Sequence, residues 1–101
     1  MVGEGGGRKT IRMKDMKELE RILKACANGR RLAILKFLKR AHRTSVSDIA
    51  REIELSFKST SRHLTILRSA DILDREQIGL EVFYWIAEPL KPAAKQILSF
   101  L

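Results

Sequence analysis

The chain has 101 residues, of which 45% are hydrophobic and 32% charged, and this balance is typical of one small globular domain. No apolar run approaches the roughly 20 residues that cross a bilayer, and none near the start resembles a secretory signal, so we expect a cytoplasmic protein with no membrane partner. The formal net charge of +8 favours a polyanionic partner, and the single cysteine excludes an intrachain disulfide.

The charges are unevenly distributed along the chain. Residues 71–88 carry five acidic side chains and only one basic side chain, Arg75. Two earlier stretches, 30–43 and 56–70, contain no acidic residue, and their basic residues are Arg30, Arg31, Lys36, Lys39, Arg40, Arg43, Lys58, Arg62 and Arg68. A basic middle suits contact with nucleic acid, but a solvated protein surface explains such runs equally well.

The predicted elements begin after residues 1–12, a stretch rich in glycine and basic residues that we expect to be a disordered arm before a domain over 13–101. Over 13–26, apolar residues at steps of three and four predict a helix with one apolar face, made by Met16, Leu19, Leu23 and Cys26. On that face Cys26 is interpreted as a small buried side chain rather than a reactive thiol.

A second helix is predicted over 29–41, with Asn28 as its N-cap, because the asparagine oxygen can accept a bond from a free helix N–H. Its apolar residues cover more than one side of the helix: Leu32, Ile34, Leu35, Phe37 and Leu38. This breadth predicts a helix at the centre of the fold.

Two shorter helices are predicted next, over 47–54 and 57–70, with Ser45 and Ser56 as capping residues. Ser45 and Asp48 have the spacing of a capping box. The expected inner faces comprise Val46, Ile49, Ala50 and Ile53 in the first helix and Thr60, Leu64 and Leu67, with Phe57 as a further candidate, in the second. The outward positions of the second helix are polar or basic: Lys58, Ser59, Ser61, Arg62 and Thr65.

Two helices joined by a short turn, the second with a polar and basic start, form a helix-turn-helix pattern. In DNA-binding proteins of this kind, the start of the second helix enters the major groove, where such side chains reach base edges and phosphates. The pattern alone does not establish DNA binding, because packed helix pairs are common in all-α proteins.

After Ala70 the apolar period changes to two, and a turn near Ile78 and Gly79 separates two strands of a hairpin, or wing. In the return strand we expect the core to bury either Val82, Tyr84 and Ile86 or the opposite pair, Phe83 and Trp85. Helix packing is favoured for Phe83 and Trp85 over a stacking platform for single-stranded bases. A last helix beginning at Pro89 or Pro92 carries an apolar stripe with no obvious surface to cover, so we expect it to pair with the first helix of a second copy: Leu90, Ala93, Ala94, Ile97, Leu98 and Leu101.

The fold class is therefore α+β, mainly α with a small β-hairpin, in the order α-α-α-α-β-β-α. From Leu23 to Ile86 the chain resembles the ArsR/SmtB-like winged helix-turn-helix repressors. The marks of this resemblance are the segments ANGRRLAIL, SVSDIA and STSRHLTILRSADIL, the last being the most specific. The resemblance implies a homodimer that binds double-stranded DNA at a palindromic operator.

The resemblance also implies which side chains touch DNA: Phe57, Lys58, Ser59, Ser61, Arg62 and His63, with Arg75 as the one basic residue of the wing. Phe57 departs from the polar residue usual at its place, and we expect it to pack onto the core rather than touch a thymine methyl. Glu54 and Asp71 stand where the family usually has glycine at helix ends. Aspartate tolerates left-handed backbone moderately and glutamate poorly, so we expect the fold to survive with altered turns.

The metal-binding side chains of many such repressors are missing. The segments RTSVSDIA and PLKPAAKQILSF contain neither cysteine nor histidine, so we expect no metal and no other cofactor. A thiol switch would require Cys26 to pair with its copy in a dimer. No catalytic constellation can be assembled, which argues against an enzyme. The alternative function is a winged-helix module that binds a protein or RNA.

Overall fold

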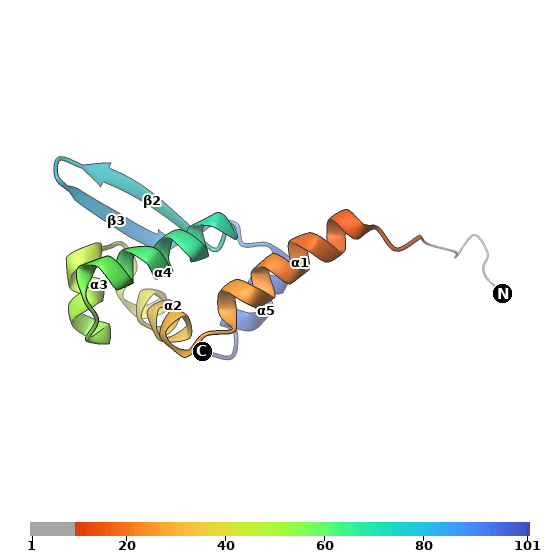
Figure 1. Cartoon of the computed structure of the whole chain (residues 1–101), viewed down its shortest axis with the longest axis horizontal. Helices are drawn as coiled ribbons and strands as arrows, with labels where there is room; N and C mark the ends of the chain where they lie inside the picture. The colour runs from red at the N-terminus through yellow and green to blue at the C-terminus, as the bar shows by residue number, and fades with distance from the viewer. Residues whose placement is uncertain (1–9) are drawn as a thin grey trace.

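The computed structural model describes residues 10–101, and the first nine residues of the predicted arm lie outside them. Over 10–101 the chain forms five helices and one three-stranded sheet (Figure 1). The elements are α1 Met13–Cys26, α2 Gly29–Ala41, β1 Thr44–Ser45, α3 Val46–Ile53, α4 Phe57–Ser69, β2 Leu73–Ile78, β3 Glu81–Ile86 and α5 Pro92–Leu98. The predicted α+β class is confirmed, and the predicted bounds of the first four helices are within one residue of those observed.

The predicted capping residues explain why three helices begin where they do. The Asn28 side-chain oxygen accepts bonds from the backbone N–H groups of Arg30 and Arg31, at 3.0 and 3.1 Å. Ser45 and Ser56 each accept a bond from the backbone N–H three residues later, at 3.2 and 3.1 Å. Such caps satisfy N–H groups that have no partner within the helix, so local sequence alone fixes these starts.

Left-handed backbone ends two of the helices, although glutamate and aspartate replace the usual glycine there. Glu54, after α3, has φ 55° and ψ 50°, and Asp71, after α4, has φ 63°. The next N–H after Glu54, that of Leu55, bonds to the carbonyl of Ala50 and closes the end of α3. A side chain at such a position costs roughly 1 kcal/mol relative to glycine. His42, after α2, also has a positive φ, which the sequence did not predict.

The sheet has a strand that the sequence did not predict. β2 and β3 form the expected antiparallel hairpin, but β1 pairs with the other edge of β3, so the strand order is β1-β3-β2. Thr44 lies opposite Tyr84 in this pairing. A strand of two residues is too short to show an alternating pattern, and its partner is distant in sequence. The predicted two-stranded hairpin is therefore corrected to a three-stranded sheet.

The core forms around α2, whose side chains Ile34, Leu35 and Leu38 are almost completely buried. Tyr84 of β3 is buried, and Val82 and Ile86 pack against the core, so the core uses this set rather than Phe83 and Trp85. The other buried apolar side chains come from the other four helices, from the turn after α4 and from the first residue of β2: Ile22, Ala25, Cys26, Val46, Ile49, Leu64, Leu67, Ala70, Ile72, Leu73, Ala94 and Leu98. One continuous core thus holds α4 and the wing together.

The last helix begins at Pro92, and Pro89 lies in the turn before it. The expectation that this helix has no surface of its own chain to cover is wrong. Ala94 and Leu98 are buried in the core, and Leu90, Ile97 and Leu101 pack around them. This surface has no local signal in the sequence, because α2, β3 and α5 create it only when the chain is folded.

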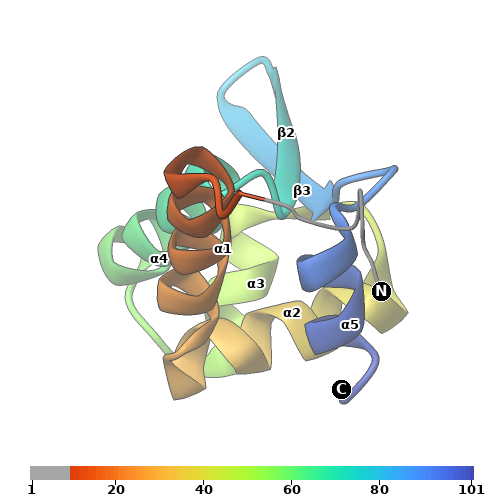
Figure 2. The same cartoon turned by 90° about the vertical axis from the view of Figure 1, so that its right-hand side faces the viewer.

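The first helix has two apolar faces instead of the single one predicted. Ile22 and Ala25 are buried together with Cys26, whereas the other members of the predicted face are 37 to 49% exposed: Met16, Leu19 and Leu23. Figure 2 shows α1 and α5 on the same side of the molecule, facing the viewer. Within residues 10–101 no helix is long and apolar enough to cross a membrane.

Candidate nucleic-acid interface

Helix α4 packs one face on the core and turns most of its polar side chains outward. Thr60, Leu64 and Leu67 have no exposed surface, while Lys58, Ser59, Arg62 and Thr65 are exposed, and Ser61 and His63 are half-buried. Positions 60, 64 and 67 lie on one face of a helix, so packing that face on the core turns the others outward. The helix therefore presents a polar and cationic surface along its first two turns.

Phe57 is not packed on the core, and that expectation is wrong. Its side chain is 59% exposed at the first position of α4. Helical side chains lean toward the N-terminus, and at the first position no preceding turn lies beneath them, so the ring extends beyond the helix end. The result is a large apolar group on a surface that is otherwise polar.

Arg31 connects three helices through its guanidinium group. Its Nε donates to the carbonyl of Ala25, at 2.6 Å, and its Nη2 donates to that of Lys24, at 3.4 Å, near the end of α1. Its Nη1 lies 3.1 Å from Nδ1 of His63 in α4. A guanidinium has no acceptor, so Nδ1 of His63 accepts this bond and the neutral ring carries its proton on Nε2. This contact has no signal in the sequence, because the residues are far apart along the chain.

The surroundings of His63 oppose its protonation. Burial lowers the pKa of its imidazole below the ordinary value, and the positive charges of Arg31, Arg30 and Arg62 lower the pKa further. An imidazole that is neutral near pH 7 acts as a hydrogen-bond donor through Nε2 and not as a cation. His63 therefore contributes polarity rather than charge to the face of α4.

The wing places Arg75 beside the end of α4. Arg75 lies opposite Tyr84 in the β2–β3 register, so the two side chains share the face of the hairpin that looks toward the helices. Arg75 lines a hollow of about 260 Å³ with Arg68 and Thr65 of α4. By contrast, the tip of the wing is apolar, with Ile78 and Leu80 exposed. The basic side chain thus lies at the base of the wing.

The basic run 30–43 does not form one surface. Arg31 is used between helices, Arg40 pairs with Glu52 at 3.7 Å, and Arg43 pairs with Glu76 of β2. The Arg43 guanidinium also lies over the rings of Phe83 and Trp85, at 5.8 and 4.5 Å from their centroids. Both rings are half-buried and pack on this arginine, and the choice between helix packing and base stacking stays a prediction.

Cys26 is buried, and burial raises the pKa of its thiol, with a smaller opposing effect of Arg31. The prediction of a small core side chain agrees with this placement. Among residues 10–101, no three His, Cys, Asp or Glu side chains gather as they would to hold a metal ion.

Residues 28–75 match the family model described as bacterial regulatory protein, arsR family. Reduced HlyU from Vibrio cholerae is 30% identical over 88% of this chain and 90% of that chain, with a TM-score of 0.72. The homodimeric winged helix-turn-helix DNA-binding domain Mb0332 from Mycobacterium bovis is 26% identical over 93% and 83%, with a TM-score of 0.77. The transcriptional repressor PagR of Bacillus anthracis is 26% identical over 88% and 98%, with a TM-score of 0.73. A comparison with curated protein sequences found no match.

Replacement of Arg31 by glutamine should raise the pKa of His63, because it removes a nearby positive charge and the donor to Nδ1. The folded wild-type protein binds the His63 proton less tightly than the unfolded chain, so it loses stability as pH falls below about 6.5. This acid-side loss should be smaller in Arg31→Gln. NMR titration of the His63 ring, with unfolding free energies at about pH 7.5 and 5.5, measures both effects.

Arg30→Gln is the matched control, since it removes one positive charge without a bond to His63. A His63 pKa that rises as much in Arg30→Gln as in Arg31→Gln would contradict the assigned role of Arg31.

Proposed function

The chain belongs to the ArsR family of bacterial regulatory proteins, and we propose that it is a homodimeric transcriptional repressor that binds a specific double-stranded DNA sequence. The observation that carries this proposal is the division of α4 into a fully buried face and a polar, cationic face beside the wing. Family membership supplies the DNA-binding function, and the division of α4 supplies the surface.

The residues at the start of α4 have the chemistry that the major groove requires. Arg62 carries a guanidinium that can bond to two acceptors of a guanine at once, and Lys58 is placed to neutralise phosphate. Ser59, Ser61 and the Nε2–H group of His63 offer short polar contacts. Arg75 lines a hollow at the base of the wing with Arg68, Asp71 and Asp74, and it is the one basic side chain of the wing that could reach a phosphate.

Phe57 has a different role in this proposal. Its exposed ring stands at the end of α4 that would enter the groove first. The C5 methyl of thymine is the apolar group that base pairs present in the major groove. The exposure of the ring rules out core packing. We therefore assign Phe57 to contact with a thymine methyl.

The dimer is proposed from the exposed apolar side chains of α1. A stripe beside α5 is formed by Met16, Leu19 and Leu23. Phe100, two residues after the end of α5, is also 80% exposed. A stripe of this kind on a monomer favours aggregation, and a second copy covers it symmetrically. The related domain Mb0332 is homodimeric. Two recognition helices related by a twofold axis imply a palindromic operator, and no metal or other cofactor enters the proposal.

The alternative of an RNA-binding module has less support. A stacking platform needs free aromatic faces, and the Arg43 guanidinium lies over both Phe83 and Trp85. Repression follows from occupation of a promoter, as implied by the family resemblance, and the related PagR is a transcriptional repressor.

Arg62→Ala should weaken binding to the preferred duplex by about 5- to 100-fold, the effect of one lost base or phosphate contact. Lys95→Ala removes the same charge from α5 and should leave the affinity within about twofold. Fluorescence anisotropy at several salt concentrations measures the affinity and its salt dependence. Equal affinity of the wild-type protein for the preferred and for unrelated duplexes would refute sequence-specific binding.

Substitution of uracil for thymine removes only the C5 methyl from the duplex. At one position in each half-site this change removes two methyl groups and should weaken wild-type binding about 15-fold, roughly fourfold for each buried methyl group. Phe57→Ala should bind the thymine and uracil duplexes equally, and removal of this exposed ring leaves the core unchanged. A Phe57→Ala protein that still discriminates thymine from uracil at that position would exclude the contact.

Leu23→Glu should convert the dimer into a monomer, because it places a charge in the centre of the exposed α1 stripe. Leu80→Glu, the same change at the fully exposed wing tip, should leave the dimer intact. Sedimentation velocity distinguishes the two states, and circular dichroism checks the fold. A Leu23→Glu protein that stays dimeric would show that the interface lies elsewhere.

A further inference from the structure

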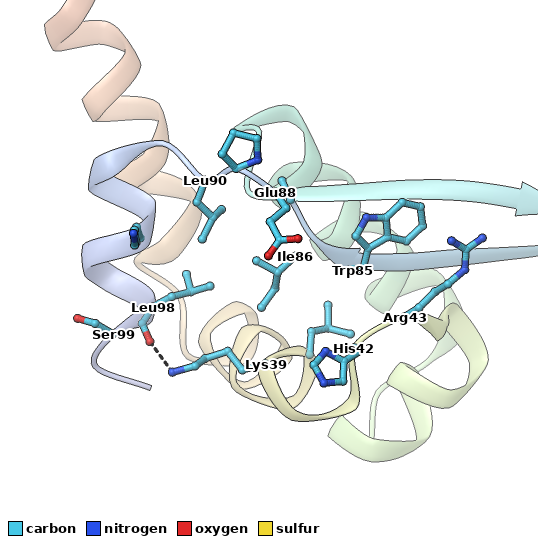
Figure 3. A pocket seen from close by; sticks show the side chains of 13 residues that line it. Lys39, His42, Arg43, Trp85, Ile86, Glu88, Leu90, Leu98 and Ser99 are labelled. Atoms are coloured by element: carbon cyan, nitrogen blue, oxygen red, sulfur yellow. Dashed lines mark hydrogen bonds between the residues drawn. The ribbon is translucent and has the colours of Figure 1, made fainter.

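A pocket of about 760 Å³ opens between the end of α2, the end of β3 and α5. Figure 3 shows Leu90, Ile86 and Leu98 directed toward its centre, with Lys39 of α2 and His42, the residue after α2, on one side. Sites for small organic molecules usually occupy about 300 to 1,000 Å³. The size of the pocket therefore suits a small organic molecule.

The inner surface of the pocket is apolar. Leu38, Ala87 and Leu98 are buried, and Ile86 and Leu90 are partly buried around them. Trp85 contributes an aromatic side chain to the wall. Its ring is held by the Arg43 guanidinium, 4.5 Å from the ring centroid. An occupant would thus bury an apolar body, a ring or a short chain, on a preformed surface.

The lining of the pocket carries more positive than negative charge. Lys39, Arg43 and Lys95 line the pocket, and Figure 3 shows its one carboxylate, Glu88, between Leu90 and Ile86. Arg43 is paired with Glu76, and Lys39 donates to the carbonyl of Leu98, at 2.9 Å, which fixes its ammonium group at the pocket while leaving it charged. Lys95 forms no ion pair within residues 10–101. Lys39 and Lys95 thus leave an excess of cationic charge over an apolar floor.

We propose that this pocket binds a small apolar monocarboxylate. The apolar body lies on Leu38, Ile86 and Leu98, and the carboxylate lies between the ammonium groups of Lys39 and Lys95. A single negative charge suits the site better than a phosphate dianion, because Glu88 repels the second charge. The site is separate from the polar face of α4. Ligand binding in the pocket can therefore be tested without any assumption about DNA binding.

The chain has one tryptophan, Trp85, so intrinsic fluorescence reports directly on the pocket. Phenylacetate is the probe, and phenylacetamide, which has nearly the same shape without the charge, is its matched control. Phenylacetate should change the fluorescence saturably, and phenylacetamide should bind at least about tenfold more weakly, since charge-assisted bonds to an ammonium group are about twice as strong as neutral ones.

Lys95→Gln should weaken phenylacetate binding at least about fivefold, because it removes an exposed rim cation without disturbing the core. Lys14→Gln, on α1, makes the same change away from the pocket and should have no effect. No saturable change with phenylacetate, equal affinity for phenylacetamide, or an unchanged affinity in Lys95→Gln would each overturn the proposal. If Trp85 fluorescence changes with protein concentration but does not change with phenylacetate, a second copy covers the pocket. This result would also overturn the proposal.

Discussion

Leu64 and Leu67 have no exposed surface, because the inner face of α4 packs against the core around α2. Burial of a leucine side chain contributes roughly 1.5 to 3 kcal/mol, so rotation of α4 about its axis would lose several kcal/mol and bury charged groups in addition. The outward direction of Lys58 and Arg62 follows from this packing. The same core fixes β3 through Tyr84, so the wing and α4 keep one relative position.

Arg31 adds a polar connection to this apolar one. Its bonds join the end of α1, which carries the proposed dimer surface, to His63 in α4, which carries the proposed DNA surface. The bond also fixes which nitrogen of His63 is free. Arg31 therefore holds α4, the proposed DNA-binding helix, against α1, the helix of the proposed dimer interface. The two proposed surfaces keep a fixed relative position.

Local features were predictable from the sequence, and contacts between distant segments were not. Asn28, Ser45 and Ser56 cap helices through bonds within three residues, so their patterns are visible in the chain. The pairing of β1 with β3, the Arg31–His63 bond and the surface beneath α5 exist only after folding. The apolar spacing of α4 predicts a buried Phe57, but the first residue of a helix can fit this spacing without lying over the core. Family membership was recognisable because the α4 segment is continuous in sequence.

Two copies of α4 should bind one DNA sequence together. Selection of bound duplexes from a random pool, followed by sedimentation of the complex, measures this binding. We expect an inverted repeat whose half-site centres lie about one helical turn, roughly 10 base pairs, or a multiple of that apart, with two chains bound per duplex. Enrichment of no sequence, or of a single asymmetric site that binds one chain, would contradict it.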